Sequence, residues 1–282
     1  MNILVLGGSG RLGRRLVPLL RAAGADVQAP AREECNATSG EDVHAFLTAR
    51  KVDVCISLVA ATDVPGCERD PRVAYASNVT AALVTAAECQ EEEVPFLWVS
   101  SDYVVAGGPT PAPPKADPMS FGRLALLPPG SRVYAESKNR GEAAVLLNGG
   151  TVARVAFCDP DEAARWTWVD GYGMASREWV EQTAARLSIL ATQYVARGSE
   201  VGEIVHVGPI RGIDDGDLGP WRTRLDLLRD RMPRHPALRR IAWCPADRVR
   251  FGANDAPGDT RFDGCDVRLA LPPDHRPDWS RR

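Results

Sequence analysis

The chain has 282 residues, 44% of them hydrophobic, which is enough for one large α/β domain with a smaller appendage. Its 34 basic and 37 acidic side chains leave a net charge of -3, so there is no bulk attraction to nucleic acid or to an anionic membrane. No apolar run approaches the roughly 18 residues that span a bilayer, and the N-terminus lacks a basic region and a cleavage site. We therefore expect a cytoplasmic protein that binds neither nucleic acid nor membrane.

Cysteine and histidine are placed without any metal-ligand pattern. The seven cysteines form no C-x-x-C pair, and the four histidines lie far apart in the sequence. Zinc sites in proteins need closely spaced ligands of these types, and disulfide frameworks favour secreted chains. We expect no metal site and no disulfide framework.

The first hundred residues alternate between strand and helix patterns. The expected elements are strand 2–6, a glycine turn at 7–13, helix 14–23, strand 26–29, helix 41–50, strand 52–59, helix 72–88 and strand 95–99. The strands are short and nearly continuous in apolar residues, as is typical of parallel strands buried on both faces. This alternation predicts an α/β fold with a doubly wound parallel sheet, the Rossmann architecture.

The second half of the chain returns to this sheet after a long interruption. Residues 105–132 hold seven prolines and are predicted to form a loop. The later expected elements are a helix from 133 to the stop at 148–150, strand 151–157, helix 178–196 and strand 203–207. We predict that residues 1–157, with the return segment 178–208, form a Rossmann domain, an architecture that binds dinucleotides. Residues 158–177 and 209–282 are predicted to form a smaller, C-terminal substrate-binding lobe.

Three glycines follow the first strand as G-x-x-G-x-x-G. A glycine at such a place lets the backbone turn sharply or lets a pyrophosphate approach the main chain, and the next helix offers unpaired N–H groups and a positive dipole end. We expect this turn to bind a dinucleotide cofactor through Gly7, Ser9, Gly10, Arg11, Leu12 and Gly13.

The end of the second strand indicates which dinucleotide is bound. An acidic residue about twenty positions past the glycines normally holds the ribose 2′-hydroxyl of NAD, yet residues 27–31 contain no carboxylate. Because Arg32 and Arg11 lie nearby, a 2′-phosphate is better accommodated, and we expect NADPH rather than NADH. In the alternative, both arginines are merely solvated and Glu33 takes the acidic role.

Hydroxyl and amine groups gather after the fourth strand. Ser101 stands at the carboxyl end of strand 95–99, where open α/β sheets place their sites. Tyr134 and Lys138 stand four apart on one helix face. An ammonium near a phenol lowers the pKa of that phenol toward working pH and makes it a usable proton donor. The pattern predicts Ser101, Tyr134 and Lys138 as catalytic residues.

These motifs together resemble the extended short-chain dehydrogenase/reductases, and longer segments resemble the dTDP-4-dehydrorhamnose reductase family. The similar segments are 99–104 (family "STDYVF"), 134–142 ("YGxSKxxGE"), 154–157 ("RTSW"), 202–208 ("GxYHVGG") and 259–263 ("DTSLD"). The resemblance spans nearly the whole chain. The chain departs from the family pattern at Ser101, where threonine is usual, at Phe157, where tryptophan is usual, and at Ser57, where asparagine is usual.

The resemblance implies an NADPH-dependent oxidoreductase of deoxysugar biosynthesis, which reduces the 4-keto group of a nucleotide-diphosphate 6-deoxy sugar. Tyr134 would donate a proton, Ser101 would hydrogen-bond the carbonyl oxygen, and Lys138 would bind the nicotinamide ribose and tune Tyr134. Ala60 and Asn78 would be further cofactor contacts. The substrate contacts would be Asp102, Tyr103, Phe157 and Tyr172. The resemblance is also compatible with a homodimer.

Two other functions share this scaffold. A nucleotide-sugar 4,6-dehydratase needs a Thr-Asp-Glu run, whereas here Ser101 and Asp102 are followed by Tyr103. The alternative that stays open is a non-catalytic NADP-binding regulatory subunit, similar to that of methionine adenosyltransferase. The sugar, the nucleotide and the product stereochemistry are not specified by the sequence.

Overall fold

The computed structural model describes residues 1–105, 131–165, 178–197, 202–208 and 224–234. The strands are β1 (Asn2–Leu6), β2 (Asp26–Gln28), β3 (Val54–Ser57), β4 (Phe96–Ser101), β5 (Thr151–Val155), β6 (Phe157–Cys158), β7 (Glu178–Trp179) and β8 (Ile204–Val207). The helices are α1 (Gly13–Ala22), α2 (Gly40–Ala49), α3 (Val64–Arg69), α4 (Pro71–Tyr75), α5 (Ala81–Glu91), α7 (Arg132–Leu147), α8 (Pro160–Ala163), α9 (Val180–Arg197) and α10 (Arg224–Arg231). Two short segments have other helical geometries: η1 (Ala76–Thr80) is a π-helical turn, wider than an α-helix, and η2 (Asp102–Val105) is a 3-10 helical turn, tighter than an α-helix.

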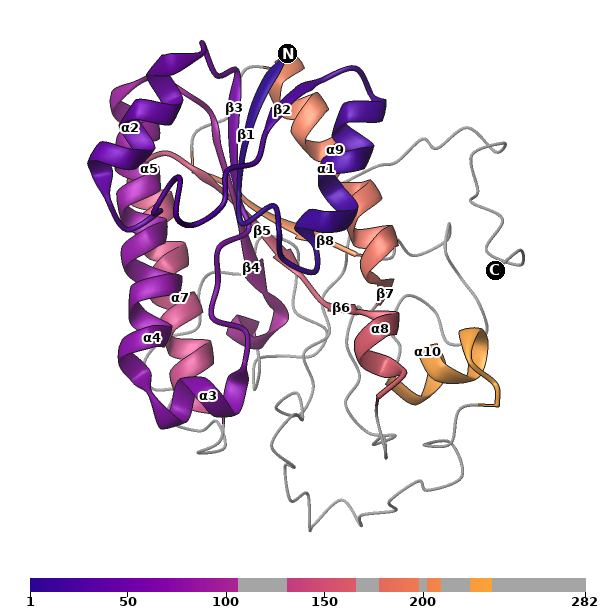
Figure 1. Ribbon diagram of the computed structural model, residues 1–282. Helices are drawn as coiled ribbons and strands as arrows, with labels where there is room; N and C mark the ends of the chain where they lie inside the picture. Colours follow the sequence, from indigo (N-terminus) through magenta and orange to yellow (C-terminus); the bar gives the residue numbers. More distant parts are fainter. Residues whose placement is uncertain (106–130, 166–177, 198–201, 209–223, 235–282) are drawn as a thin grey trace.

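Six strands form one parallel sheet in the order β2-β1-β3-β4-β5-β8. The helices α1 and α9 cover one face, and α2, α5 and α7 cover the other (Figure 1). The predicted doubly wound fold is therefore confirmed. Because the chain leaves β1 toward β2 on one side and returns to β3 on the other, the sheet has its switch point between β1 and β3, where ligands bind in such folds.

Alternate side chains of the strands supply two hydrophobic cores. Ile3, Val5 and Leu97 pack toward α1 and α9, whereas Leu4 and Trp98 pack toward α2, α5 and α7, and all five are essentially inaccessible to solvent. A parallel strand buried on both faces reads as a continuous apolar run, which is why these strands were visible in the sequence.

The predicted helix 72–88 is interrupted. The structure has α4, then one π-helical turn, then α5. The side chain of Asn78, in this wider turn, points inward. Its amide oxygen accepts from the Ala61 N–H at 2.9 Å, and its amide nitrogen donates to the Ser137 Oγ at 2.9 Å. The interruption thus joins the end of β3 to helix α7 through one buried side chain.

The predicted strand 151–157 ends early, and the predicted helix from residue 178 starts late. Both neighbours of β5 end level with Val155, since Ser101 of β4 and Val207 of β8 are its partners. Residues beyond Val155 have no partner in the main sheet, and β6 pairs instead with β7 in a separate two-stranded sheet. The chain therefore leaves the sheet at residue 156 and returns to it through α9.

The proposed division into domains concerns many residues outside the described ranges. Of the predicted substrate-binding lobe, the structure describes 158–165, which include α8, and 224–234, which include α10. The predicted loop 105–132 also lies almost wholly outside the described residues, as does Tyr172. The division therefore stays a prediction.

Candidate active site

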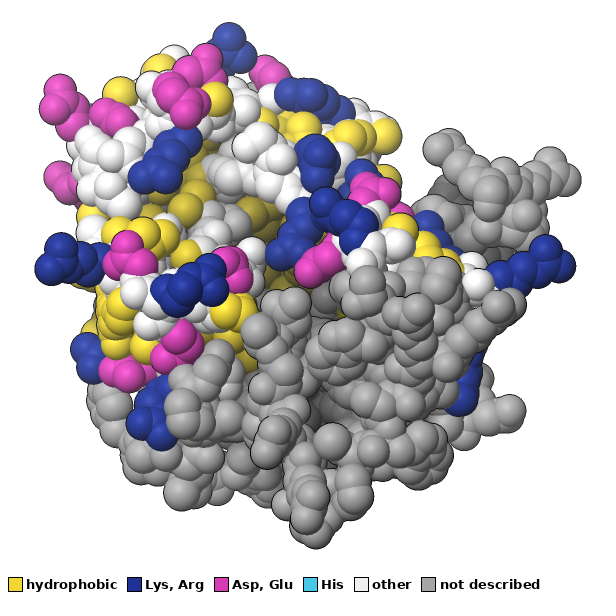
Figure 2. Space-filling view, turned by 60° about the horizontal axis from the view of Figure 1, so that its bottom comes forward, with side chains coloured by type: hydrophobic (Ala, Val, Ile, Leu, Met, Phe, Trp, Pro, Cys, Tyr) yellow, Lys and Arg dark blue, Asp and Glu magenta, His cyan; other side chains and the backbone are white. Residues whose placement is uncertain are grey.

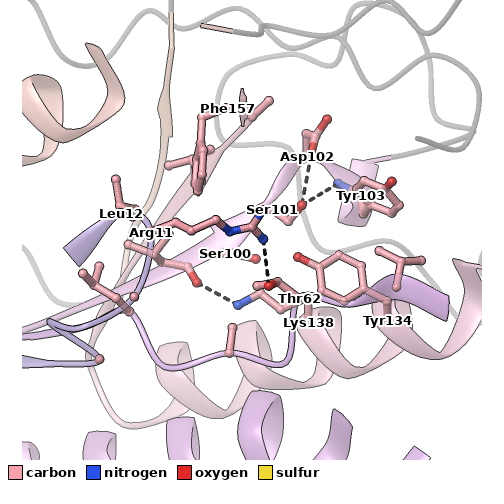
Figure 3. Close-up of a pocket in the computed structure, with 18 of the residues that line it drawn as sticks. Arg11, Leu12, Thr62, Ser100, Ser101, Asp102, Tyr103, Tyr134, Lys138 and Phe157 are labelled. Carbon is pink, nitrogen blue, oxygen red and sulfur yellow. Dashed lines mark hydrogen bonds between the residues drawn. The ribbon is translucent and has the colours of Figure 1, made fainter. Parts of the chain in front are cut away.

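A cleft of about 450 Å³ lies at the carboxyl ends of β1, β3, β4 and β5. Figure 2 looks toward this end of the molecule and shows a hollow with hydrophobic walls and with basic and acidic side chains at its rim. Of the predicted site residues, the cleft is lined by Gly7, Gly10, Arg11, Leu12, Gly13, Ala60, Ser101, Asp102, Tyr103, Tyr134, Lys138 and Phe157. Residues far apart in the sequence therefore meet in one cleft, next to the glycine turn (Figure 3).

The glycine turn has the close packing that a dinucleotide site requires. Gly7 has φ +80°, a conformation that favours glycine. A Cβ on Gly13 would lie 2.5 Å from the carbonyl oxygen of Gly8, so only glycine lets α1 begin this close to β1. A Cβ on Gly10 would lie 3.2 Å from the Gly7 carbonyl oxygen, on the side that lines the cleft. The N-terminus of α1 is thus open to an anionic group.

A second hollow, of about 260 Å³, lies on the other side of the glycine turn. Ser9 and Gly10 border it together with Arg32, Asn36 and Thr38. Arg11 points the other way, into the larger cleft, where its guanidinium donates to the Thr62 hydroxyl at 3.0 Å. The structure therefore does not bring Arg11 and Arg32 to one site, so they do not face a single 2′-phosphate position together, and a role of Arg32 at a 2′-phosphate stays a prediction.

Ser101 stands at the end of β4 with its hydroxyl in a defined orientation. Its Oγ donates to the Asp102 carboxylate at 3.0 Å and accepts from the Tyr103 N–H at 3.3 Å. The short η2 turn after β4 brings these three residues together at the floor of the cleft. All three are buried, so their hydrogen bonds are little weakened by solvent.

Tyr134 lies in the first turn of α7 and is held by an aromatic contact. Its ring meets that of Tyr103 edge to face, with 5.1 Å between the centroids. Burial raises the pKa of the Tyr134 phenol well above its usual value; hydrogen bonding with Ser101 lowers it, and the charge of Asp102 raises it. The expected lowering by Lys138 is not what this structure shows: the cation that lowers this pKa is Arg11, and burial outweighs it. The phenol is therefore protonated at neutral pH.

Lys138 is buried one helical turn after Tyr134. Its Nζ donates to the Val99 carbonyl oxygen at 2.8 Å and lies 3.8 Å from the centroid of the Trp98 ring. Burial lowers the pKa of this amine to about 7, although the nearby Glu142 carboxylate raises it. The amine thus changes its charge within the physiological range of pH.

Among known proteins, the RmlD substrate binding domain family matches residues 1–158. A dTDP-4-dehydrorhamnose reductase of Streptomyces griseus is 30% identical over an alignment of 274 positions, and the match covers 89% of this chain and 84% of that protein. The chain belongs to the dTDP-4-dehydrorhamnose reductase family.

Further relatives match more locally. A probable low-salt glycan biosynthesis reductase of Haloferax volcanii is 38% identical over an alignment of 117 positions, and the match covers 38% of this chain and 39% of that protein. Apart from the Streptomyces griseus relative, such matches span about half of the curated relatives or less. Among solved structures, a dTDP-4-dehydrorhamnose reductase from Bacillus anthracis in complex with NADP has a TM-score of 0.71 at 17% identity, covering 93% of this chain and 90% of that one. This likeness confirms the fold.

Not every residue that the family resemblance singled out reaches the cleft. Asn78 is fully buried beneath it and binds the backbone at Ala61, so it supports the loop that follows β3 and does not line the cleft. Phe157 lines the wall opposite Tyr134. Tyr172 lies outside the described residues.

Sequence reasoning missed Thr62, Asp63 and Glu162, which also line the cleft. Thr62 and Asp63 follow the end of β3, so their place was open to the same argument that found Ser101. Glu162 comes from α8, in the predicted lobe, and no sequence signal pointed to it.

In the part of the chain that the structure describes, no three His, Cys, Asp or Glu side chains are grouped as metal ligands, and no helix is long and apolar enough to cross a bilayer.

Proposed function

We propose that the protein is an NADPH-dependent reductase of the 4-keto group of a nucleotide-linked 6-deoxy sugar. The observation that carries the proposal is the meeting of Ser101, Tyr134 and Lys138 beside the glycine turn in one cleft. Family membership supports the substrate class, because relatives are named dTDP-4-dehydrorhamnose reductase and, in Streptomyces niveus, dTDP-4-keto-6-deoxy-D-glucose reductase.

The residues of both hollows fit a dinucleotide. The N-terminus of α1 would bind the diphosphate through the turn of Gly7, Gly10 and Gly13, and Arg32 would pair with a 2′-phosphate. The fold neighbour from Bacillus anthracis was solved with NADP. When bound, the nicotinamide would supply a hydride to the carbonyl carbon of the sugar.

Tyr134 would supply the matching proton. As the hydride adds to the carbonyl carbon, negative charge builds on its oxygen, and the buried phenol, neutral at working pH, would transfer its proton there. Rotation of the Ser101 hydroxyl away from Asp102 would let it donate to the same oxygen. The product is the alcohol, and the charged Lys138 amine would stabilise the phenolate left behind.

The substrate would enter from the open side of the cleft. Asp102 and Tyr103 on η2, together with Phe157 on the opposite wall, would contact the sugar. Tyr172 would also contact the sugar, and one arginine of the predicted lobe, 158–177 and 209–282, would bind its diphosphate through two parallel hydrogen bonds.

The test is oxidation of NADPH, followed at 340 nm, with a panel of dTDP-, GDP- and UDP-linked 4-keto-6-deoxy sugars, and analysis of the alcohol formed. The proposal expects turnover with at least one of them, and the dTDP sugars are the first candidates. A protein that binds NADPH, oxidises none of it across the panel and alters the activity of a partner enzyme would instead be a regulatory binding subunit.

A further inference from the structure

A row of buried polar side chains crosses the sheet beneath helix α7. Ser100 of β4, Arg154 of β5 and His206 of β8 are register partners on adjacent strands, so their side chains lie on the same face of the sheet. This is the face that carries Trp98 and packs against α7. Glu142 of α7 meets the row, and Arg154, Glu142 and His206 are fully inaccessible to solvent.

The row is joined by short hydrogen bonds. Arg154 donates two hydrogen bonds to the Glu142 carboxylate, from Nε at 2.9 Å and from an Nη at 2.6 Å. The Ser100 hydroxyl donates to the same carboxylate at 2.6 Å. The other Nη of Arg154 lies 3.3 Å from Nε2 of His206. Because a guanidinium can only donate, Nε2 must accept, and His206 is neutral. The carboxylate of Glu142 is therefore fixed in position against the Arg154 guanidinium.

This carboxylate stands one helical turn after Lys138. Position 142 follows 138 on the same face of α7, and Lys138 in turn reaches the Val99 carbonyl oxygen and the Trp98 ring on the strand that carries Ser100. Burying a charged amine against a carbonyl oxygen and an aromatic face is costly, and a fixed negative charge nearby offsets that cost.

Several other charged or titratable groups face Lys138. From its own helix these are Tyr134 and Glu142, from α3 Cys67, and from β5 Arg154 through its pair with Glu142. Across the cleft lie Arg11, Asp63, Asp102 and Glu162. Of these, Glu142 is the principal influence that favours the charged amine, and Cys67 is a smaller one.

We propose that Glu142 is a positioning residue for the reaction, the fixed countercharge that keeps the Lys138 amine protonated, and that Arg154 and Ser100 hold it in place. The role in turnover rests on the proposed function, whereas the effect on Lys138 itself does not. The Glu142–Arg154 pair thus does more than join α7 to the sheet. It sets the charge of a catalytic side chain.

A titration of Lys138 itself separates this role from a purely structural one. The chain contains only three lysines, Lys51, Lys115 and Lys138. Labelling lysine with 13C at Cε gives three NMR signals, which Lys51→Arg and Lys115→Arg assign. In the wild type we expect the Lys138 signal to titrate near neutral pH, well below the usual range of a lysine amine.

Glu142→Gln keeps the shape and the acceptor for Ser100 but removes the charge, so Lys138 should titrate at least about one pH unit lower. Glu142→Gln/Arg154→Met removes both charges, and its Lys138 should titrate between the wild type and Glu142→Gln. Only the charges predict this order of the three Lys138 titrations. A loss of contacts would instead perturb the double variant more than the single one, because the double variant loses more contacts. Glu136→Gln, whose carboxylate pairs with Arg140 on the outer side of α7, is the matched control and should leave the titration unchanged.

Turnover should follow the titration. The pH at which kcat falls should be lower in Glu142→Gln than in the wild type. In the double variant this pH should lie between those two values. If Glu142→Gln does not fold, the double variant alone must titrate below the wild type. The inference is overturned if Lys138 titrates alike in all folded variants, or if wild-type Lys138 titrates with Lys51. A shifted titration without any sugar reduction would instead count against the proposed function alone.

Discussion

Arg11 and Glu162 form an ion pair that joins the glycine turn to helix α8 at the rim of the cleft. A second pair, Arg15 with Asp161 at 3.3 Å, ties the first turn of α1 to the same short helix. Arg11 is also bound to Thr62, so its guanidinium points into the cleft toward the loop that follows β3 (Figure 3). A basic side chain beside the proposed diphosphate site is thus already engaged with a carboxylate.

Glu162→Gln should tighten the binding of NADPH by roughly two- to fivefold. The glutamine removes a negative charge from the cleft and frees Arg11 for the diphosphate, and half-exposed ion pairs contribute only modestly. Isothermal titration of the wild type and the variant measures the effect. Asp161→Asn, on the same helix but paired with Arg15, is the control and should change affinity less. Weaker binding in Glu162→Gln would mean that the pair helps to form the cofactor site.

Arg32→Ala should reduce the preference for NADPH over NADH by about tenfold or more, mainly through weaker NADPH binding. Arg32 borders the smaller hollow, where the 2′-phosphate is proposed to lie, and loss of a charge-assisted hydrogen bond costs about 1.5–3 kcal/mol. Arg11→Ala is the matched variant, because it faces the other hollow and should affect both cofactors alike. Equal loss of both cofactors in Arg32→Ala would assign the 2′-phosphate to other residues.

Tyr134→Phe should lower turnover by about 10²- to 10⁴-fold, the contribution typical of a general acid, while the affinity for NADPH barely changes. The phenylalanine keeps the edge-to-face contact with Tyr103 and removes only the hydroxyl. Steady-state kinetics with the best sugar of the panel, together with a binding titration, give both quantities. Turnover within tenfold of the wild type would assign the proton to another group.

The fold and much of the site could be predicted because both depend on local patterns. Apolar runs mark the strands, and a residue that follows such a run falls at the carboxyl edge of the sheet, which is how Ser101 and the glycine turn were found. The pair of Arg11 with Glu162 joins residues 151 positions apart, through a helix of four residues that has no periodicity to recognise. This ion pair follows only from the three-dimensional arrangement of the two segments.

The charge states were also beyond the sequence. The spacing of Tyr134 and Lys138 indicated a lowered pKa for the phenol, but the structure buries both side chains, and burial dominates each of them. Burial disfavours the charged form, so it moves the pKa of a phenol up and that of an amine down. Sequence spacing gives the neighbours of a group but not its solvent exposure.

Lys138→Met should stabilise the fold, and more so at pH 6 than at pH 9. The pKa of the amine is about 7 in the folded protein and 10.5 when unperturbed. Below pH 7 both states bind the proton, so the cost of burying the charge is fully present. Between pH 7 and 10.5 the unfolded chain holds a proton that the folded chain has released, and wild-type stability rises with pH. Methionine removes this cost at every pH.

Urea unfolding of the wild type and Lys138→Met at both pH values measures the difference. We expect a gain in unfolding free energy of about 2 kcal/mol or more at pH 6, because a buried amine with a strongly lowered pKa carries several kcal/mol of desolvation cost, partly offset by the lost hydrogen bond to Val99. The gain should shrink at pH 9. Lys51→Met, at an exposed lysine, is the control and should show no such pH dependence. An equal difference at the two pH values would mean that the Lys138 amine keeps its ordinary pKa in the fold, and with it a charge that Glu142 need not maintain.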